Sequence, residues 1–340
     1  MKRVVFRADG NAQIGLGHVM RCLALAEMLG SDYDHCFAIV QPTPAVVQLI
    51  QEQGMTIIEL LKSPDDLAAL LVELDFDDVL VLDGYAFDKD YQQSCRDVVD
   101  SLIYIDDLCE SDPVADIIIN HAGGAKREDY YPDNLFHYRE KQLLLGTDYA
   151  LIRQPFLHIA RQSGFTNSPT ELPFKTVFVN LGGADPSNYS WRVVDSLLQN
   201  QPNRHITLIL GAANLHRDTF SQFPTNNLSL MTNLSANEMV ETIQRCDVAV
   251  VSCSTISYEV ALLRRPFVGI VTADNQAALE KFYTEKELSL SILSAMFTPN
   301  ELEIALATTP KMLSAIMTRQ LHHFDGHSNE RLATVFRNFT

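Results

Sequence analysis

The sequence predicts two doubly wound α/β domains that face a cleft, and three observations lead to this fold class. Short runs of β-branched residues alternate with helical stretches along the 340 residues, a pattern typical of parallel sheets flanked by helices. An irregular stretch over 155–173 divides the chain, and a second series of strands begins after it. In each series a glycine turn follows the first strand, as in doubly wound sheets that bind ligands beyond their strand ends.

The order of these runs predicts the individual elements. We expect a first domain over 1–154, with strands at 3–8, 35–40, 56–59, 78–83, 102–106, 116–120 and 142–145. We expect a linker over 155–173 and a second domain over 174–340. Strands of the second domain are expected at 176–181, 205–210, 228–231, 248–252, 267–271 and 288–290, with late helices at 300–307 and 311–322.

Composition limits the partners that the chain can have. Asp and Glu number 43 against 26 Lys and Arg, so the net charge of −17 repels nucleic acid and anionic membranes. No apolar run reaches the ~18 residues of a membrane helix, and the first residues lead into a strand rather than a signal peptide. The six cysteines form no Cys-x-x-Cys pair, which is typical of reduced thiols. We therefore expect a cytoplasmic protein with no nucleic-acid or membrane partner.

The first glycine turn carries the strongest indication of chemistry. Gly15 and Gly17 allow a ligand to approach the N-terminus of the following helix, where free N–H groups and the helix dipole favour an anion. His18 follows at once, so an anion site and a titratable group share one turn. Met20 stands where the dinucleotide fingerprint needs its third glycine, which argues against a nicotinamide or flavin cofactor. The alternative is that the glycines serve only tight packing.

The second domain offers two related features. Gly182 and Gly183 follow its first strand and would let a phosphate approach, unless they form only a tight turn capped by Asp185. Ser254 and Thr255 begin a helix directly after the strand at 248–252, where a diphosphate could bind. Glu259 on that helix could accept hydrogen bonds from ribose hydroxyls, or it could simply complement the helix dipole.

Further polar residues end strands on the same edge. Asp83 and Tyr85 follow one strand, and Asn275 and Gln276 would place two amides beside a bound sugar or cap the next helix. Aspartate pairs such as Asp106-Asp107 commonly cap turns. The histidines show no metal-ligand spacing, so we expect no metal site and no cofactor.

Taken together, these motifs resemble the UDP-sugar hydrolase family of pseudaminic acid biosynthesis, in order from about residue 3 to at least 276. The stretches that carry the resemblance are Arg7-x-Asp9-Gly10, Gly15-x-Gly17-His18-Val19-Met20-Arg21, Asp83-x-Tyr85, Ile105-Asp106-Asp107, Leu145-Gly146-x-x-Tyr149-Ala150-Leu151-Ile152-Arg153, Gly182-Gly183-Ala184-Asp185-Pro186 and Ser254-Thr255-x-x-Tyr258-Glu259. The family is similar in fold to GT-B glycosyltransferases, so the resemblance implies two Rossmann-like domains. Many relatives have glycine where this chain has Cys253, which leaves the detail of the phosphate loop open.

The resemblance implies removal of UDP from UDP-2,4-diacetamido-2,4,6-trideoxy-β-L-altrose to release the free sugar. The catalytic histidine of the family matches His18, and its active-site tyrosine and asparagine match Tyr85 and Asn275. We expect substrate contacts from a wider set on both domains, namely Gly15, Gly17, Arg21, Asp83, Tyr85, Asn275 and Gln276. UDP contacts are expected from Gly182, Gly183, Ser254, Thr255 and Glu259.

A mechanism follows from the position of His18. The helix dipole opposes protonation of a histidine at a helix N-terminus, which suits a general base. We expect His18 to deprotonate water that attacks the anomeric carbon with inversion, without a metal. A GT-B glycosyltransferase with an alcohol acceptor, a nucleotide-sugar epimerase and a non-catalytic nucleotide-sugar sensor remain alternatives.

Overall fold

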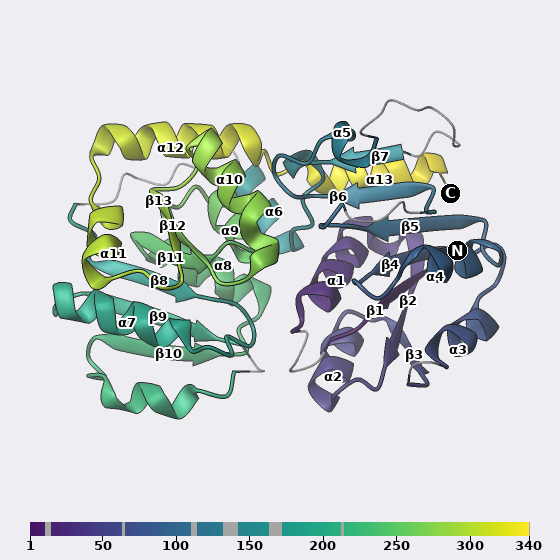
Figure 1. Ribbon diagram of the computed structural model, residues 1–340, viewed down its shortest axis with the longest axis horizontal. Coiled ribbons are helices and arrows are strands. Elements are labelled where there is room, and N and C mark those ends of the chain that lie inside the picture. Colours follow the sequence, from purple (N-terminus) through teal and green to yellow (C-terminus); the bar gives the residue numbers. More distant parts are fainter. Residues whose placement is uncertain are drawn as a thin grey trace. The chain divides into compact units, whose positions relative to one another are not determined.

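The computed structural model describes residues 1–10, 15–62, 65–109, 114–131, 142–162, 172–211 and 214–339. The chain divides into two compact units, one of Met1–Leu151 with Ser328–Thr340 and one of Ile152–His327 (Figure 1). Each unit has its own parallel sheet. Within the described ranges, no helix has the length and apolar character needed to cross a membrane.

The sheet of the first unit has seven parallel strands in the order β3-β2-β1-β4-β5-β6-β7. The strands are β1 (Lys2–Ala8), β2 (Tyr33–Val40), β3 (Thr56–Leu60), β4 (Val79–Asp83), β5 (Ser101–Ile105), β6 (Ile117–Asn120) and β7 (Gln142–Leu145). β4 and β5 are buried along their whole length, as expected of strands covered on both faces. Because the strand order reverses at β1 and β4, the loops after these two strands meet at a switch point where such sheets bind ligands.

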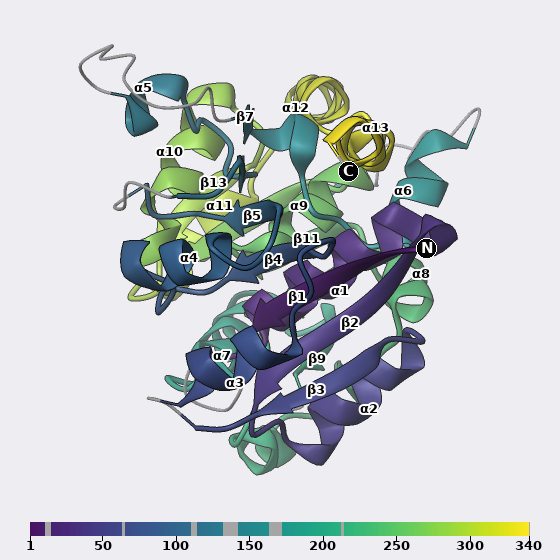
Figure 2. The same ribbon diagram turned by 90° about the vertical axis from the view of Figure 1, so that its right-hand side faces the viewer.

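Helices cover both faces of this sheet (Figure 2). On one face lie α1 (Gly17–Leu29), α2 (Pro44–Glu52) and α13 (Ser328–Phe339), and on the other lie α3 (Asp66–Glu73) and α4 (Lys89–Arg96). Gly10 lets α1 approach β1, because a Cβ there would lie 2.6 Å from Cγ2 of Val19. The short α5 (Arg127–Tyr130) follows β6, and 3-10 turns η1 (Gly30–Asp32) and η2 (Thr147–Tyr149) complete the unit.

The second unit has six parallel strands in the order β10-β9-β8-β11-β12-β13. They are β8 (Thr176–Asn180), β9 (His205–Leu210), β10 (Leu228–Thr232), β11 (Val248–Ser252), β12 (Phe267–Val271) and β13 (Ser291–Ser294). The helices are α6 (Gln154–Arg161), α7 (Tyr189–Asn200), α8 (Ala236–Arg245), α9 (Thr255–Leu262), α10 (Ala277–Lys286), α11 (Pro299–Leu306) and α12 (Pro310–His323), with 3-10 turns η3 (Arg217–Gln222) and η4 (Asp274–Gln276). α7 and α11 share one core cluster with the sheet, and α6 packs on α8 and α9.

Three elements differ from the sequence-based expectation. Part of the expected linker is helix α6, which begins with Pro155 in its first turn, a position where proline's missing N–H costs nothing. The expected strand at 288–290 is shifted to β13, because Leu288 packs at the C-terminal end of α10 instead: its N–H donates to Tyr283 O of that helix at 3.1 Å and its side chain is fully buried. Finally, α13 belongs to the first unit, where Phe336 packs edge-on against Tyr33. The expected second domain, 174–340, had included this helix.

Candidate functional site

His18 is the second residue of α1, the helix that follows β1 in the chain. Gly15 has φ +78°, a backbone conformation that favours glycine, and Leu16 is the N-cap residue without a side-chain capping bond. Among the residues that the structure describes, the first-turn N–H groups of α1 therefore have no side-chain cap. Gly17 has open space where a Cβ would be. The backbone here has the features of an anion site that the sequence predicts.

Asp83, the last residue of β4, holds the His18 ring. Nδ1 of His18 lies 2.7 Å from Oδ1 of Asp83. Asp83 is completely buried, and a carboxylate can only accept hydrogen bonds, so this contact assigns the proton to Nδ1. Nη2 of Arg21 also lies 2.8 Å from Nδ1, and it donates to the same oxygen of Asp83. We therefore assign Nε2 of His18 as the basic nitrogen.

Arg21 lies one turn after His18 and connects two carboxylates. Its Nε donates to Oδ2 of Asp83 at 3.0 Å and its Nη2 to Oδ1 at 2.5 Å. Its Nη1 donates to Oδ2 of Asp107 at 2.6 Å. Arg21 and Asp83 were both expected to contact substrate, but in the structure they form hydrogen bonds with each other. Both also contact Nδ1 of the His18 ring.

Electrostatics keep Asp83 ionised. Burial by itself raises the pKa of its carboxyl group, but the charge of Arg21 and the hydrogen bonds from His18 and Arg21 outweigh burial, so the pKa lies below its ordinary value. The ionised carboxylate of Asp83 therefore lies 2.7 Å from Nδ1 of His18.

Tyr85 packs against the ring of His18. The two rings meet edge to face with centroids 4.8 Å apart, and the Tyr85 hydroxyl donates to Asp107 at 3.4 Å. Tyr85 is 52% exposed, which is unusual for a large aromatic residue that contacts a buried histidine. The structure thus brings together four of the residues expected at the site, His18, Arg21, Asp83 and Tyr85.

The glycine turn of the second unit is held by its neighbours. Asn180, at the end of β8, accepts a hydrogen bond from Gly182 N at 3.2 Å and donates to Ile209 O of β9 at 3.1 Å. Gly182 has φ +99°. Asp185 accepts from the N–H groups of Tyr189 and Ser190 at 2.9 and 2.8 Å, so a protein carboxylate already caps α7. An anion at this turn would therefore be bound by the loop amides rather than by α7.

The N-terminus of α9 differs in this respect. Ser254 is the N-cap residue and makes no side-chain capping bond. Its hydroxyl contacts Ser252 Oγ at 2.8 Å, and Ser257 links the Ser254 carbonyl to the hydroxyl of the buried Tyr283. Thr255 is half-buried at the first helical position. Within the described part of the chain, α9 therefore keeps its first-turn amides free of a side-chain cap, as α1 does.

Glu259 is in an ion pair. Nε and Nη2 of Arg153 donate to its two carboxylate oxygens at 2.6 and 2.7 Å. Glu259 is buried at 3% exposure, so its expected contact with a ribose would have to be made alongside Arg153. Arg153 is the last residue of the Leu145–Arg153 motif named in the sequence analysis, but the sequence indicated no role for it.

The two expected amides lie on the loop after β12. Asn275 is exposed within the 3-10 turn Asp274–Gln276. Gln276 folds back on its own loop, where its Oε1 accepts from Thr272 N at 2.8 Å and its Nε2 donates to Thr272 Oγ1 at 3.1 Å. The side chain of Gln276 is thus engaged within its own loop.

His121 is a buried titratable residue to which sequence reasoning assigned no role. It follows β6, and its Nδ1 accepts a hydrogen bond from Leu151 N at 3.2 Å. Burial and the positive charge of Arg21 lower the pKa of His121 to about 4. Its place at a strand end, after Asn120, was the only signal in the sequence.

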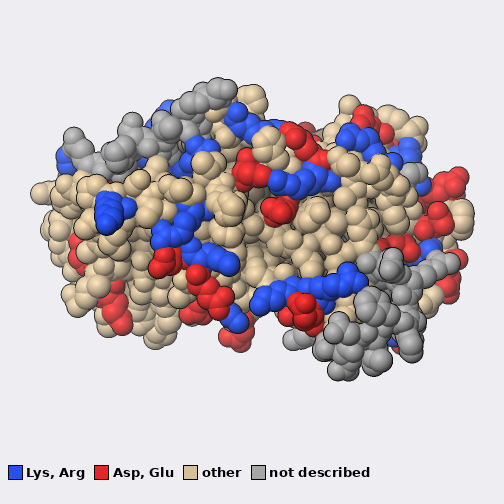
Figure 3. All heavy atoms as spheres, turned by 90° about the horizontal axis from the view of Figure 1, so that it is seen from above, with Lys and Arg blue, Asp and Glu red and all other residues tan. Residues whose placement is uncertain are grey.

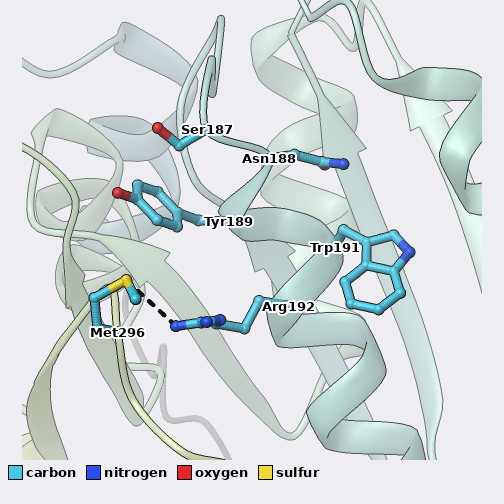
Figure 4. Close-up of a pocket in the computed structure, with 6 residues that line it drawn as sticks. All are labelled: Ser187, Asn188, Tyr189, Trp191, Arg192 and Met296. Carbon is cyan, nitrogen blue, oxygen red and sulfur yellow. Dashed lines mark hydrogen bonds between the residues drawn. The ribbon is translucent and has the colours of Figure 1, made fainter.

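Other features of the molecule lie apart from these residues. A hollow of about 420 Å³ is lined by Ser187, Asn188, Tyr189, Trp191, Arg192 and Met296 (Figure 4). It contains none of the expected site residues. Basic and acidic side chains are interspersed on the face seen in Figure 3. No group of three or more His, Cys, Asp or Glu residues able to hold a metal ion occurs within the described ranges.

Comparison with known proteins gives distant relatives. The chain is 25% identical over 286 residues to the UDP-2,4-diacetamido-2,4,6-trideoxy-β-L-altropyranose hydrolase of Campylobacter jejuni, covering 84% of this chain and 97% of that protein. It is 20% identical to the spore coat polysaccharide biosynthesis protein SpsG of Bacillus subtilis, covering 86% and 84%. It is 23% identical to an uncharacterized protein of Methanocaldococcus jannaschii, covering 84% of this chain but only 58% of that protein. No family model matches the chain.

Solved structures show the fold. MurG of Acinetobacter baumannii is similar with a TM-score of 0.62 at 14% identity, covering 99% of this chain and 100% of that one. HepE of Anabaena, solved in complex with UDP-glucose, has a TM-score of 0.59 at 13% identity and the same coverage. The chain therefore has a GT-B glycosyltransferase-like fold built from two parallel α/β sheets, and the predicted fold class is confirmed.

The glycines after β8 and β9 provide a matched pair of variants. Gly183→Ala places its Cβ in space that no described residue occupies, whereas the Cβ of Gly211→Ala would lie 2.2 Å from Gly183 O. We expect Gly183→Ala to keep its stability within about 1 kcal/mol and to lose UDP affinity at least roughly tenfold, because the added methyl group would occupy the space that the sequence predicts for a phosphate. We expect Gly211→Ala to lose about 1–3 kcal/mol or more of stability. Thermal unfolding and calorimetry with UDP measure both effects, and full UDP affinity in Gly183→Ala would remove this turn from the site.

The pKa of His121 predicts a pH dependence of stability. Its pKa is about 4 in the folded protein, against an ordinary value of 6.5 for histidine, so between these values the unfolded chain binds a proton that the folded one does not. The free energy of unfolding should therefore decrease as the pH falls from 6.5 to 4, by about 1.4 kcal/mol per pH unit. His121→Asn keeps an acceptor for Leu151 N and should show a smaller slope in urea unfolding over this range. An unchanged slope would contradict the assignment.

Proposed function

We propose that the protein is a UDP-sugar hydrolase, and that its substrate is UDP-2,4-diacetamido-2,4,6-trideoxy-β-L-altrose. The observation that carries the proposal is the 2.7 Å contact between His18 and the buried carboxylate of Asp83. A buried carboxylate that orients an imidazole is an arrangement for proton transfer. The similarity to the Campylobacter hydrolase extends over 97% of that protein and supports the choice of substrate.

In the proposed reaction, water attacks the anomeric carbon while Nε2 of His18 takes its proton. The bond between the anomeric carbon and the phosphate oxygen breaks, and UDP leaves with the bonding electrons. A single displacement of this kind inverts the anomeric centre. Asp83 acts as the positioning residue: it holds the proton on Nδ1 and stabilises the imidazolium that forms.

The second unit is proposed to bind the UDP part. Its candidate donors for the diphosphate are the first-turn amides of α9, the hydroxyls of Ser254 and Thr255, and the amides of Gly182 and Gly183. Backbone N–H groups that already point at the leaving phosphate stabilise its charge without rearranging during the reaction. A metal ion is then not required for departure of UDP.

Two other functions fit parts of this arrangement. A GT-B glycosyltransferase would use the same nucleotide contacts with an alcohol in place of water, and the solved structures of similar fold include glycosyltransferases. A nucleotide-sugar sensor would need the contacts of the second unit, but not a base oriented by a buried carboxylate. The His18–Asp83 pair therefore favours an enzyme over a sensor.

Incubation with a panel of UDP-sugars and detection of free UDP tests the proposal directly. We expect UDP release in water alone, with the diacetamido-trideoxyhexose compound as the preferred substrate and the free sugar identified by mass spectrometry. Release only after addition of an alcohol acceptor would identify a glycosyltransferase, and binding without release would identify a sensor.

The role of His18 predicts a specific change in kinetics. His18→Asn keeps a polar side chain but cannot take a proton at neutral pH, so turnover should fall about 10²–10⁴-fold with substrate affinity largely kept. His322→Asn, at an exposed position of α12, is the control. In H₂¹⁸O, the label should appear in the released sugar. Label in the phosphate of UDP would show attack at phosphorus and contradict the role given to His18.

The proposed use of backbone donors predicts independence from metal ions. Activity should persist in excess EDTA and gain little from added Mg²⁺, because the amides of α9 and of the Gly182–Gly183 turn stabilise the leaving group. The measurement is the rate of UDP release by protein dialysed against EDTA. Complete loss of activity that is restored by a divalent cation would refute this account of leaving-group stabilisation.

A further inference from the structure

Arg153 lies at the start of the second unit and pairs with Glu259 of α9. Because Nε donates to Oε1 at 2.6 Å and Nη2 to Oε2 at 2.7 Å, the two side chains form a two-point contact. The guanidinium also lies over the ring of Phe156, 5.0 Å from its centroid. The Arg153 side chain is 19% exposed and that of Glu259 is 4% exposed. Arg153 is therefore held on two sides and presents a fixed charge to a buried carboxylate.

This pair determines which hydrogen-bonding positions Glu259 retains. An ionised carboxylate has about four lone-pair sites, and Arg153 uses one on each oxygen. One further position on each oxygen can accept from another donor. Glu259 lies one turn after Thr255 on α9, and the side chains of a helix lean toward its N-terminus. Glu259 therefore lies within about one turn of the end of α9 at which the nucleotide is proposed to bind.

We propose that Arg153 is a positioning residue for nucleotide recognition, which holds the Glu259 carboxylate in one orientation to accept hydrogen bonds from the vicinal hydroxyls of a ribonucleoside diphosphate. This inference rests on the proposed function. A carboxylate as buried as Glu259 pays a large desolvation cost, and the charge of Arg153 compensates it. Without Arg153, nothing fixes the orientation of the Glu259 carboxylate, which then turns toward solvent. It can then no longer accept from two neighbouring hydroxyls at once.

The test compares UDP with 2′-deoxy-UDP, which lacks one of the two hydroxyls. In calorimetry, the wild-type protein should bind UDP roughly 10- to 100-fold more tightly, the factor expected for a hydrogen bond to a charged group. Arg153→Met keeps an apolar stem without the charge, and its ratio of affinities should fall close to one. Arg153→Lys keeps the charge but not the planar fork, so its ratio should be intermediate. Only a role in recognising the hydroxyls changes this ratio.

Arg204 provides a matched control in the same unit. It makes a two-point pair with Glu303 of α11 at 2.8 and 3.0 Å, and its side chain is 3% exposed. Arg204→Met should lower the thermal stability and leave the ratio of UDP to 2′-deoxy-UDP affinity unchanged. It therefore measures the effect of losing such a pair at a place away from α9.

Three results would overturn the inference. A wild-type ratio in Arg153→Met would show that the pair only stabilises the fold. Tighter UDP binding by Arg153→Met would show that Arg153 competes with the ribose. Equal binding of both nucleotides by the wild-type protein would show that no hydroxyl is recognised, while release of UDP from the UDP-sugar would still support the proposed hydrolase.

Discussion

The buried carboxylate of Asp83 is the group on which the candidate site of the first unit depends. It stands at the end of β4, is fully buried, and accepts hydrogen bonds from His18 and Arg21, both on α1. A buried charge of this kind is tolerated only when it is paired and hydrogen-bonded, and Arg21 meets that requirement. The orientation of His18 thus follows from the need to compensate one charge in the core.

Three arginines near the candidate sites pair with carboxylates of the protein. Arg7 contacts Asp9 and Asp66, Arg21 contacts Asp83 and Asp107, and Arg153 contacts Glu259. Their positive charges therefore neutralise carboxylates within a chain whose net charge is −17. The ends of α1 and α9 present backbone N–H groups without a side-chain cap in the described residues, and these are the donors proposed for an anionic substrate.

The glycine turns after the first strand of each unit differ in their contacts and in whether the following helix is capped. In the first unit, Gly15 requires a positive φ and Gly10 a close approach to Val19, while Gly17 has open space around it. In the second unit, Gly211 packs on the backbone of Gly183, and Asp185 caps α7. The same strand–glycine–helix sequence pattern thus carries an uncapped helix end in one unit and a capped one in the other. A helix N-terminus alone does not define an anion site, because a nearby carboxylate can occupy it.

The alternation of buried runs and helices determined the sheets, because parallel strands covered on both faces must be apolar along their length, as β4 and β11 are. The pattern also brought His18, Asp83 and Tyr85 to one edge, since parallel strands all end on the same side. Sequence could not reveal that α13 returns to the first unit, that Asp83 pairs with Arg21, or that Glu259 pairs with Arg153, 106 residues earlier. These pairings join residues far apart in the chain, and they form because charges buried by packing need a partner. The local sequence pattern decided the strands and helices and the sheet edge on which the candidate residues lie, whereas tertiary packing decided which side chains pair with one another.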